Sequence, residues 1–160
     1  MIETANVAFS LRSDPKSFFF ELILDFDGRT EGIGGYEFTP EDDLMRGALM
    51  VAIGYPEPVV VRLGRYPCEG ARLILKQFDL NHADGVTAGP GRWGCEISRV
   101  DLDSWGSPES APQILGVTPS LLQFARAALE FGEASYGDFR PSTALRALRA
   151  VMPVLEADGR

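Results

Sequence analysis

The amino-acid sequence predicts an α+β domain, with a mainly antiparallel sheet of about six strands and with helices on one of its faces. Three observations lead to this prediction. One long stretch alternates apolar and polar side chains, two separate Thr-Pro pairs mark helix starts, and strand-like runs precede both pairs. The expected order of elements is therefore βββα, then βββα, then α, which places three helices against the sheet.

The length and composition are those of one folded domain covering residues 1–160. Hydrophobic residues make up 45% of the chain and charged residues 24%, which is ordinary for a globular protein. A chain of this length can bury enough apolar surface to fold without disulfides or metals. We therefore expect a single domain that needs no cofactor.

The longest alternating stretch, from Ser17 to Asp27, predicts a central strand. Alternate side chains of a strand point to opposite faces, so one face carries only apolar residues, namely Phe18, Phe20, Leu22, Leu24 and Phe26. A shorter alternating run from Val7 to Leu11 predicts the strand before it. After a turn at Asp27-Gly28, a glycine-rich strand is expected near Gly32 to Phe38.

The first helix is expected to begin at Thr39-Pro40 and to end at Gly54. Thr39 can cap the helix, and Pro40 suits the first helical position because its missing N–H has no intrahelical partner there. Gly54 can take the left-handed conformation that closes many helices. The apolar run before Gly54 would also fit a strand, and the capping residues favour the helix.

Three further strands are expected in the second half, at Val59–Arg65, Ala71–Leu80 and Arg92–Leu102. In the last of them the apolar residues change parity, which predicts a β-bulge near Ser98-Arg99. The segment from Asp103 to Gly116 contains two prolines and two glycines and is expected to be a long loop.

Two more helices complete the prediction. The second begins at Thr118-Pro119 by the same capping argument as the first. The third begins at Ser142, and Pro153 is expected to kink or end it because proline cannot donate the backbone hydrogen bond of a helix interior.

The net charge indicates the kind of partner, and the apolar content and the N-terminus indicate the expected location. The net charge of −8 repels phosphate backbones, which argues against nucleic acid and favours a basic protein partner. No apolar stretch is long enough to span a membrane, and the N-terminus lacks the features of a signal peptide, so the expected location is the cytoplasm. Cys68 and Cys95 form no metal-binding motif and are expected to be reduced.

The segment Leu22–Thr30, LILDFDGRT, resembles the first motif of the haloacid dehalogenase phosphatases, an apolar strand that ends in Asp-x-Asp-Gly. The resemblance implies that Asp25 is a nucleophile and Asp27 an acid/base. In that family the motif feeds a parallel sheet, whereas a glycine-rich strand follows here. The alternative is a hairpin whose two carboxylates are solvated.

His82 is the only histidine, so any catalytic site that needs an imidazole must use this residue. It can pair with Asp84 and act as a base, or it can be an ordinary turn residue. The surrounding segment Asp79–Gly85 lacks the ligand spacing of a calcium loop, and we expect no metal site.

The segment Asp101–Gly116 is the predicted binding surface. Trp105 would supply an apolar anchor, and negative charge would come from Asp101, Asp103 and Glu109. The competing interpretation is that Trp105 folds back into the core.

Three hypotheses for the function follow. The leading one is a small, acidic, non-catalytic binding or regulatory protein that neutralises a basic partner, in the manner of bacterial immunity proteins. The second is a carboxylate-dependent, phosphatase-like hydrolase that uses Asp25 and Asp27. The third is a structural domain that self-associates through an exposed sheet edge, which makes a homo-oligomer an alternative to a foreign partner.

Overall fold

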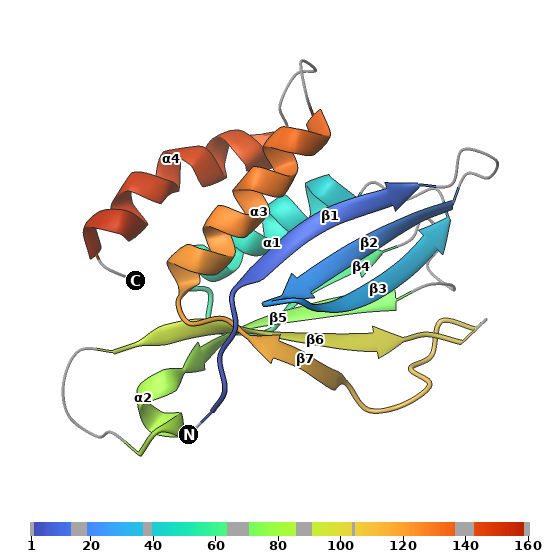
Figure 1. Cartoon of the computed structure of the whole chain (residues 1–160), viewed down its shortest axis with the longest axis horizontal. Coiled ribbons are helices and arrows are strands. Elements are labelled where there is room, and N and C mark those ends of the chain that lie inside the picture. Colours follow the sequence, from blue (N-terminus) through green and yellow to red (C-terminus); the bar gives the residue numbers. More distant parts are fainter. Residues whose placement is uncertain are drawn as a thin grey trace.

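A computed structural model of the chain describes residues 2–13, 19–36, 40–63, 71–85, 91–103, 105–136 and 143–158 (Figure 1). In these residues the elements are β1 (Val7–Ser13), β2 (Phe19–Phe26), β3 (Arg29–Tyr36), α1 (Pro40–Ala52), β4 (Val59–Leu63), β5 (Ala71–Asp79), α2 (Leu80–Ala83), β6 (Trp93–Asp101), β7 (Gln113–Val117), α3 (Leu121–Tyr136) and α4 (Thr143–Asp158).

The α+β class is confirmed, but the prediction of one six-stranded sheet with three helices is wrong. The described strands form two antiparallel sheets, in the orders β1-β2-β3 and β4-β5-β6-β7, and the described helices number four. We call them the N-terminal sheet and the C-terminal sheet. Helix α1 stands in the chain between β3 and β4, and these two strands do not pair.

Two elements are absent from the sequence prediction. Strand β7 lies at the end of the segment that we expected to be a loop, and it is five residues long. Its short length and the proline and glycine residues around it conceal the alternation that identifies a strand. Helix α2 is a single turn of four residues, too short for any helical periodicity.

In the N-terminal sheet the predicted alternation of β2 is confirmed where side chains are described. Leu22, Leu24 and Phe26 are buried. Phe18 and the side chain of Phe20 lie outside the described part of the structure. The apolar residues of the neighbouring strands that are buried on the same sheet are Val7, Phe9 and Ile33.

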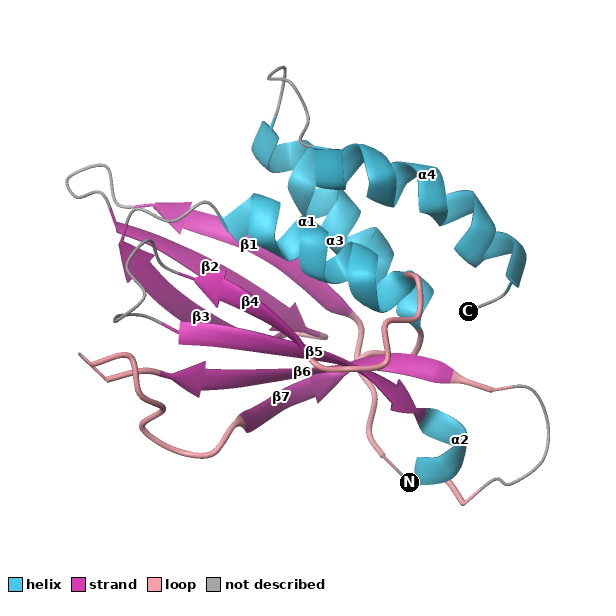
Figure 2. Cartoon of the chain, turned by 180° about the vertical axis from the view of Figure 1, so that it is seen from behind, coloured by secondary structure: helices cyan, strands magenta, loops and turns pink. Residues whose placement is uncertain are grey.

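Helix α1 occupies the centre of the core, between the C-terminal sheet on one side and α3 and α4 on the other (Figure 2). The helix prediction for this segment is confirmed. Gly54 has φ +94° and donates its N–H to the Val51 carbonyl, which closes the helix as expected. The fully buried side chains of this helix are Leu44, Met45, Ala48 and Val51.

The sequence predicts a β-bulge in β6 near Ser98-Arg99, whereas the structure has a register shift between Ile97 and Ser98 in the β6–β7 pair whose extra residue does not belong to β6. The β5–β6 register is continuous through this point. Because Gly116 pairs with Ile97 and Ile114 pairs with Ser98, the extra residue is Leu115, and the bulge belongs to β7.

Helices α1, α3 and α4 lie together on one side of the strands in both views (Figures 1 and 2). Phe124 of α3 is fully buried and meets Phe9 edge-to-face, with ring centroids 6.1 Å apart. Pro153 does not end α4, which continues to Asp158. Pro153 and Arg149 are both exposed, so water can reach the Arg149 carbonyl that proline leaves without a donor.

Two hydrogen bonds between described residues join the two sheets, and a third joins the N-terminal segment to β7. The guanidinium of Arg29, from β3, donates to the Leu115 carbonyl of β7, and in return Arg99 of β6 donates to the Gly32 carbonyl of β3 over 3.2 Å. The N–H of Ala5 donates to the Val117 carbonyl over 3.0 Å, so the N-terminal segment runs beside β7 before it enters β1 (Figure 1). One cluster of buried apolar residues includes members of both sheets and of α1, α3 and α4.

Candidate functional site

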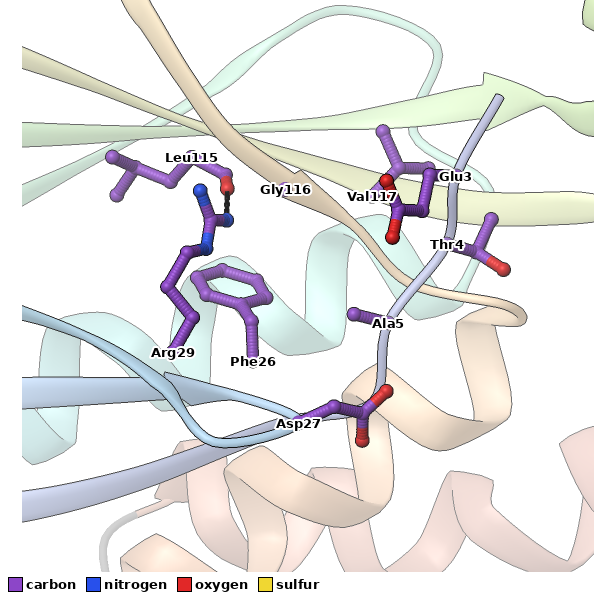
Figure 3. Close-up of a pocket in the computed structure, with 9 residues that line it drawn as sticks. All are labelled: Glu3, Thr4, Ala5, Phe26, Asp27, Arg29, Leu115, Gly116 and Val117. Carbon is purple, nitrogen blue, oxygen red and sulfur yellow. Dashed lines mark hydrogen bonds between the residues drawn. The ribbon is translucent and has the colours of Figure 1, made fainter. Parts of the chain in front are cut away.

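A cavity of about 460 Å³ lies where the two sheets and the N-terminal segment meet (Figure 3). Phe26, Asp27 and Arg29 come from the turn between β2 and β3. The opposite wall is the end of β7, and the remaining side is closed by the segment Glu3–Ala5. The full lining is Glu3, Thr4, Ala5, Phe26, Asp27, Arg29, Leu115, Gly116 and Val117.

Arg29 is held in place on two sides. Its guanidinium donates to the Leu115 carbonyl and lies over the Phe26 ring, 5.3 Å from the ring centroid (Figure 3). The ring of Phe26 fills the space next to Gly116, where an added Cβ would lie 2.6 Å from the Phe26 Cε1 atom. Arg29, the only cationic side chain of the described cavity lining, therefore links the N-terminal sheet to the C-terminal sheet.

Both carboxylates of the phosphatase-like motif accept backbone hydrogen bonds, Asp25 from within the β2–β3 hairpin and Asp27 from the segment before β1. Asp25 accepts a hydrogen bond from the Gly28 N–H over 2.9 Å, which stabilises the turn. Asp27 has φ +50° and accepts from the Asn6 N–H over 3.2 Å. Strand β2 pairs with antiparallel neighbours on both sides, whereas the resemblance implies a parallel sheet.

His82 lies in α2, where its backbone N–H donates to the Asp79 side chain over 3.1 Å. Asp84, its expected catalytic partner, is 3.7 Å from Arg92 in an ion pair. His82 is exposed, and within the described residues no hydrogen bond joins its side chain to Asp25, Asp27 or Asp84. The structure does not bring the three residues of the alternative catalytic set together.

Trp105 stands on a turn that extends β6. Its side chain is 87% exposed, so the competing prediction that it packs into the core is wrong. The Oδ1 atom of Asp103 accepts from the N–H groups of both Trp105 and Ser107, each over 2.9 Å. The Gly106 N–H donates to the Asp103 carbonyl, and the Asp103 N–H donates to the Ser107 carbonyl. Four hydrogen bonds therefore hold the backbone that carries Trp105.

The same turn continues as a short ladder. Leu102 and Pro108 form an isolated bridge, and the Glu109 N–H donates to the Asp101 carbonyl over 3.0 Å. Gly106 has φ +78°, a conformation that glycine adopts without strain. We call the described residues of this stretch, 102–103 and 105–109, the tryptophan turn. It is ordered by local hydrogen bonds, which the prediction of an irregular loop did not anticipate.

The three acids of the predicted binding surface have different roles. The Oδ1 atom of Asp101 lies 2.9 Å from the Nε atom of Arg99, and this ion pair largely offsets the negative charge of Asp101. Asp103 stabilises the tryptophan turn through its side chain. Glu109 is exposed. Of the features predicted for this surface, the exposed aromatic side chain is thus the most prominent.

Cys95 is buried in the core as a free thiol, and desolvation raises its pKa far above the ordinary value. Cys68 lies outside the described residues, so the predicted reduced state of the pair is not addressed by the structure. Within the described residues no cluster of three or more His, Cys, Asp or Glu side chains has the arrangement of a metal site. None of the described helices combines the length and the apolar character that crossing a bilayer requires.

The chain matches no known family profile, no curated protein and no solved structure.

No local sequence pattern groups Phe26, Arg29 and Gly116. Phe26 was assigned correctly to the buried face, but the other two gave no signal. Gly116 is the last residue of the segment whose composition predicts a loop, and an arginine after a turn is common on protein surfaces. Only the approach of β7 to the β2–β3 turn joins them.

Proposed function

We propose that this protein is a small, acidic, non-catalytic binding protein that presents Trp105 to a basic protein partner. The observation that supports the proposal is the exposure of 87% of the Trp105 side chain on a turn held by its own hydrogen bonds. Tryptophan is among the residues that dominate the energetics of protein interfaces. A regulator that neutralises its partner, in the manner of bacterial immunity proteins, needs such a surface and no catalytic group.

The order of the tryptophan turn is favourable for binding. A flexible loop loses conformational entropy when it binds, and a preformed turn avoids much of this cost. Here the Asp103 side chain and the Gly106 backbone restrict the turn before any partner arrives. The indole can then be desolvated against a partner with little rearrangement of the chain.

The expected partner is basic because of the charge of the whole molecule. A net charge of −8 creates a negative field that increases the association rate of cationic proteins and disfavours acidic ones. Glu109 adds an exposed carboxylate next to the tryptophan turn. The affinity should therefore fall as the salt concentration rises.

Immobilised protein and a soluble extract of the source organism provide the first test. We expect wild type to retain a basic protein, and Trp105→Ala to retain at least tenfold less of it, since loss of an interface hot spot costs about 2 kcal/mol or more. Ile114→Ala is the matched control, because Ile114 is an exposed apolar residue on the neighbouring β7, with 59% of its side chain accessible. The retained protein is then purified, and its affinity for the wild-type protein is measured at two salt concentrations. Equal retention by wild type and Trp105→Ala, or a retained partner that is acidic, would contradict the proposal.

Two substitutions at Asp103 distinguish the contribution of the ordered backbone to binding from the contribution of the Asp103 charge. Asp103→Asn keeps a side-chain oxygen that can accept from Trp105 and Ser107 but removes the negative charge. Asp103→Ala removes both. If the preformed turn is what matters, the Asn variant should bind the purified partner within about twofold of wild type and the Ala variant should bind much more weakly. Equal weakening by both variants would instead assign the role of Asp103 to its charge.

A further inference from the structure

Strand β1 is an edge strand of the N-terminal sheet, and its outer edge is hydrogen-bonded at only one place among the described residues. At that place the side-chain amide of Gln123, from α3, accepts from the Val7 N–H over 3.1 Å and donates to the Val7 carbonyl over 2.9 Å. The Gln123 amide thus occupies the position that a peptide group of a further strand would take.

The register of the sheet identifies the next free groups. Val7 directs its N–H and carbonyl away from β2, toward Gln123. In an antiparallel pair the residues alternate between facing the partner strand and facing away from it. Phe9 and Leu11, two and four residues further along β1, therefore also direct their backbone groups outward. Within the described residues no strand or side chain bonds to them.

A groove of about 370 Å³ lies directly beside this free edge. Its floor is formed by Phe9 and Leu11, and its wall by Phe131 and Ala134 of α3, with Ser10 and Ser135 completing the lining. Phe9 and Phe131 pack with ring centroids 6.2 Å apart, while Leu11 is 39% exposed. The groove is mostly apolar and opens where the outward backbone groups are located.

Helix α3 carries an exposed negative charge close in sequence to its groove-lining residues. Glu130 follows Gln123 by seven residues, which is close to two helical turns, so the two side chains leave the helix in nearly the same direction. At about 1.5 Å per residue, Glu130 lies roughly 10 Å further along α3, next in sequence to Phe131, which lines the groove. Glu130 is exposed, and within the described residues no ion pair engages it.

We propose that the outer edge of β1 is a second binding site, which takes up an extended segment of a basic partner protein as an additional strand. The segment pairs through its backbone with Phe9 and Leu11. Its apolar side chains on one face enter the groove beneath α3, and a Lys or Arg side chain on that same face approaches Glu130. Strand addition of this kind obtains affinity from main-chain hydrogen bonds and specificity from pockets for alternate side chains.

Charge distinguishes this occupant from a second copy of the chain. Pairing of β1 with β1 of another copy would bring two Glu130 side chains to one interface, between molecules that each carry a net charge of −8. Like charges placed together across an interface are unfavourable. A cationic segment meets the same edge without this repulsion.

The probe is a panel of blocked eight-residue peptides in which alternate residues, those of one face, are valine, isoleucine, leucine or phenylalanine with one lysine among them, and the residues of the other face are serine or threonine. We expect at least one to bind, and to slow hydrogen exchange of the Phe9 and Leu11 amides as measured by NMR. The decisive control is the same peptide N-methylated at alternate residues, which keeps the charge and removes the backbone donors that would face β1. It should show no binding. Equal binding of the methylated peptide would overturn the proposal, and so would failure of the entire panel at millimolar concentration.

Variants of the protein localise the site. Glu130→Gln should weaken the peptide affinity about two- to fivefold, the effect of a surface ion pair, while Glu109→Gln should leave it unchanged. Leu11→Pro should abolish binding yet preserve the fold, because its lost N–H faces away from β2. Trp105→Ala should bind the peptide normally, so failure of this site is distinguishable from failure of the tryptophan turn. A dimer in analytical ultracentrifugation that Leu11→Pro dissolves would assign the edge to self-association and reject the basic partner.

Discussion

Gly116 illustrates how a single residue allows two sheets to approach. A side chain at this position would collide with the Phe26 ring, whose Cε1 atom is 2.6 Å from the site of the added Cβ. The same ring supports the Arg29 guanidinium, which bonds to the neighbouring Leu115 carbonyl. Glycine is therefore required here for the space that it leaves, and not for a special backbone angle.

Cys95 gives a prediction at the scale of one residue. Its side chain is fully buried, and desolvation raises its pKa, so the folded protein keeps the thiol protonated at pH values where the unfolded chain begins to lose the proton. Below about pH 8.5, the ordinary pKa of cysteine, this residue adds no pH dependence to the free energy of unfolding. Above that value, stability should fall by about 1.4 kcal/mol per pH unit.

Urea melts of wild type and Cys95→Ala between pH 7 and pH 10 measure this effect. The difference in unfolding free energy between the two proteins should shrink as the pH rises, because only the wild type carries the buried thiol. Other titrating groups are common to both proteins and cancel in the comparison. A difference that is independent of pH would mean that the thiol is accessible to water in the folded state.

At the scale of the elements, the fold depends on how closely α1 approaches the C-terminal sheet. Gly47 lies in the buried face of this helix, and a Cβ at this position would be 2.8 Å from Val61 Cγ2 and 3.0 Å from Leu75 Cδ1. Glycine is a poor helix former, so its presence in the helix interior is explained by packing rather than by propensity. The helix sits on strands β4 and β5 at the distance that this glycine permits.

Gly47→Ala should destabilise the protein although alanine favours the helix. The gain in propensity is about 1 kcal/mol, while insertion of a methyl group into a packed core costs about 1–3 kcal/mol. Two side-chain atoms lie within 3.0 Å of the new methyl, so we expect the cost to dominate. Denaturant melts provide the measurement. In a Val61→Ala background, which removes the nearest atom, the same substitution should become neutral or stabilising.

At the scale of the whole molecule, the two sheets share one core. The buried apolar cluster joins residues of both sheets through α1, α3 and α4, and the paired contacts of Arg29 and Arg99 tie the sheets at their backbones. Such a continuous core predicts that both sheets unfold in one cooperative transition, as expected for a single domain of residues 1–160.

Leu22→Ala tests this cooperativity. Leu22 is fully buried in the N-terminal sheet, so its truncation should cost about 2–5 kcal/mol. The described tryptophans, Trp93 and Trp105, belong to β6 and to the turn after it. If the sheets unfold together, tryptophan fluorescence and far-UV circular dichroism should shift to the same lower urea midpoint. A fluorescence midpoint that stays at the wild-type value would instead indicate two independent units.

Local patterns in the sequence were sufficient to predict most individual elements. The alternation of β2, the start of α1 at Pro40 and its end before Gly54 each depend on residues that are neighbours in the chain. Burial and backbone geometry at these positions follow from side-chain periods of two and of about 3.6, which can be read directly. The exposed Trp105 was also identified as a candidate from its neighbours, although whether it was exposed or buried could not be decided from them.

What only the tertiary structure decided is how separate elements meet. The sequence determined that the chain is acidic, α+β and mainly antiparallel, because composition and periodicity are properties of local stretches. The division into two sheets, the bulge at Leu115 and the contact of Arg29 with β7 depend on residues distant in sequence. So does the free edge of β1 beside α3, where Gln123 and Val7 are 116 positions apart. No local period encodes such pairings, since they arise from the simultaneous packing of strands and helices around one core.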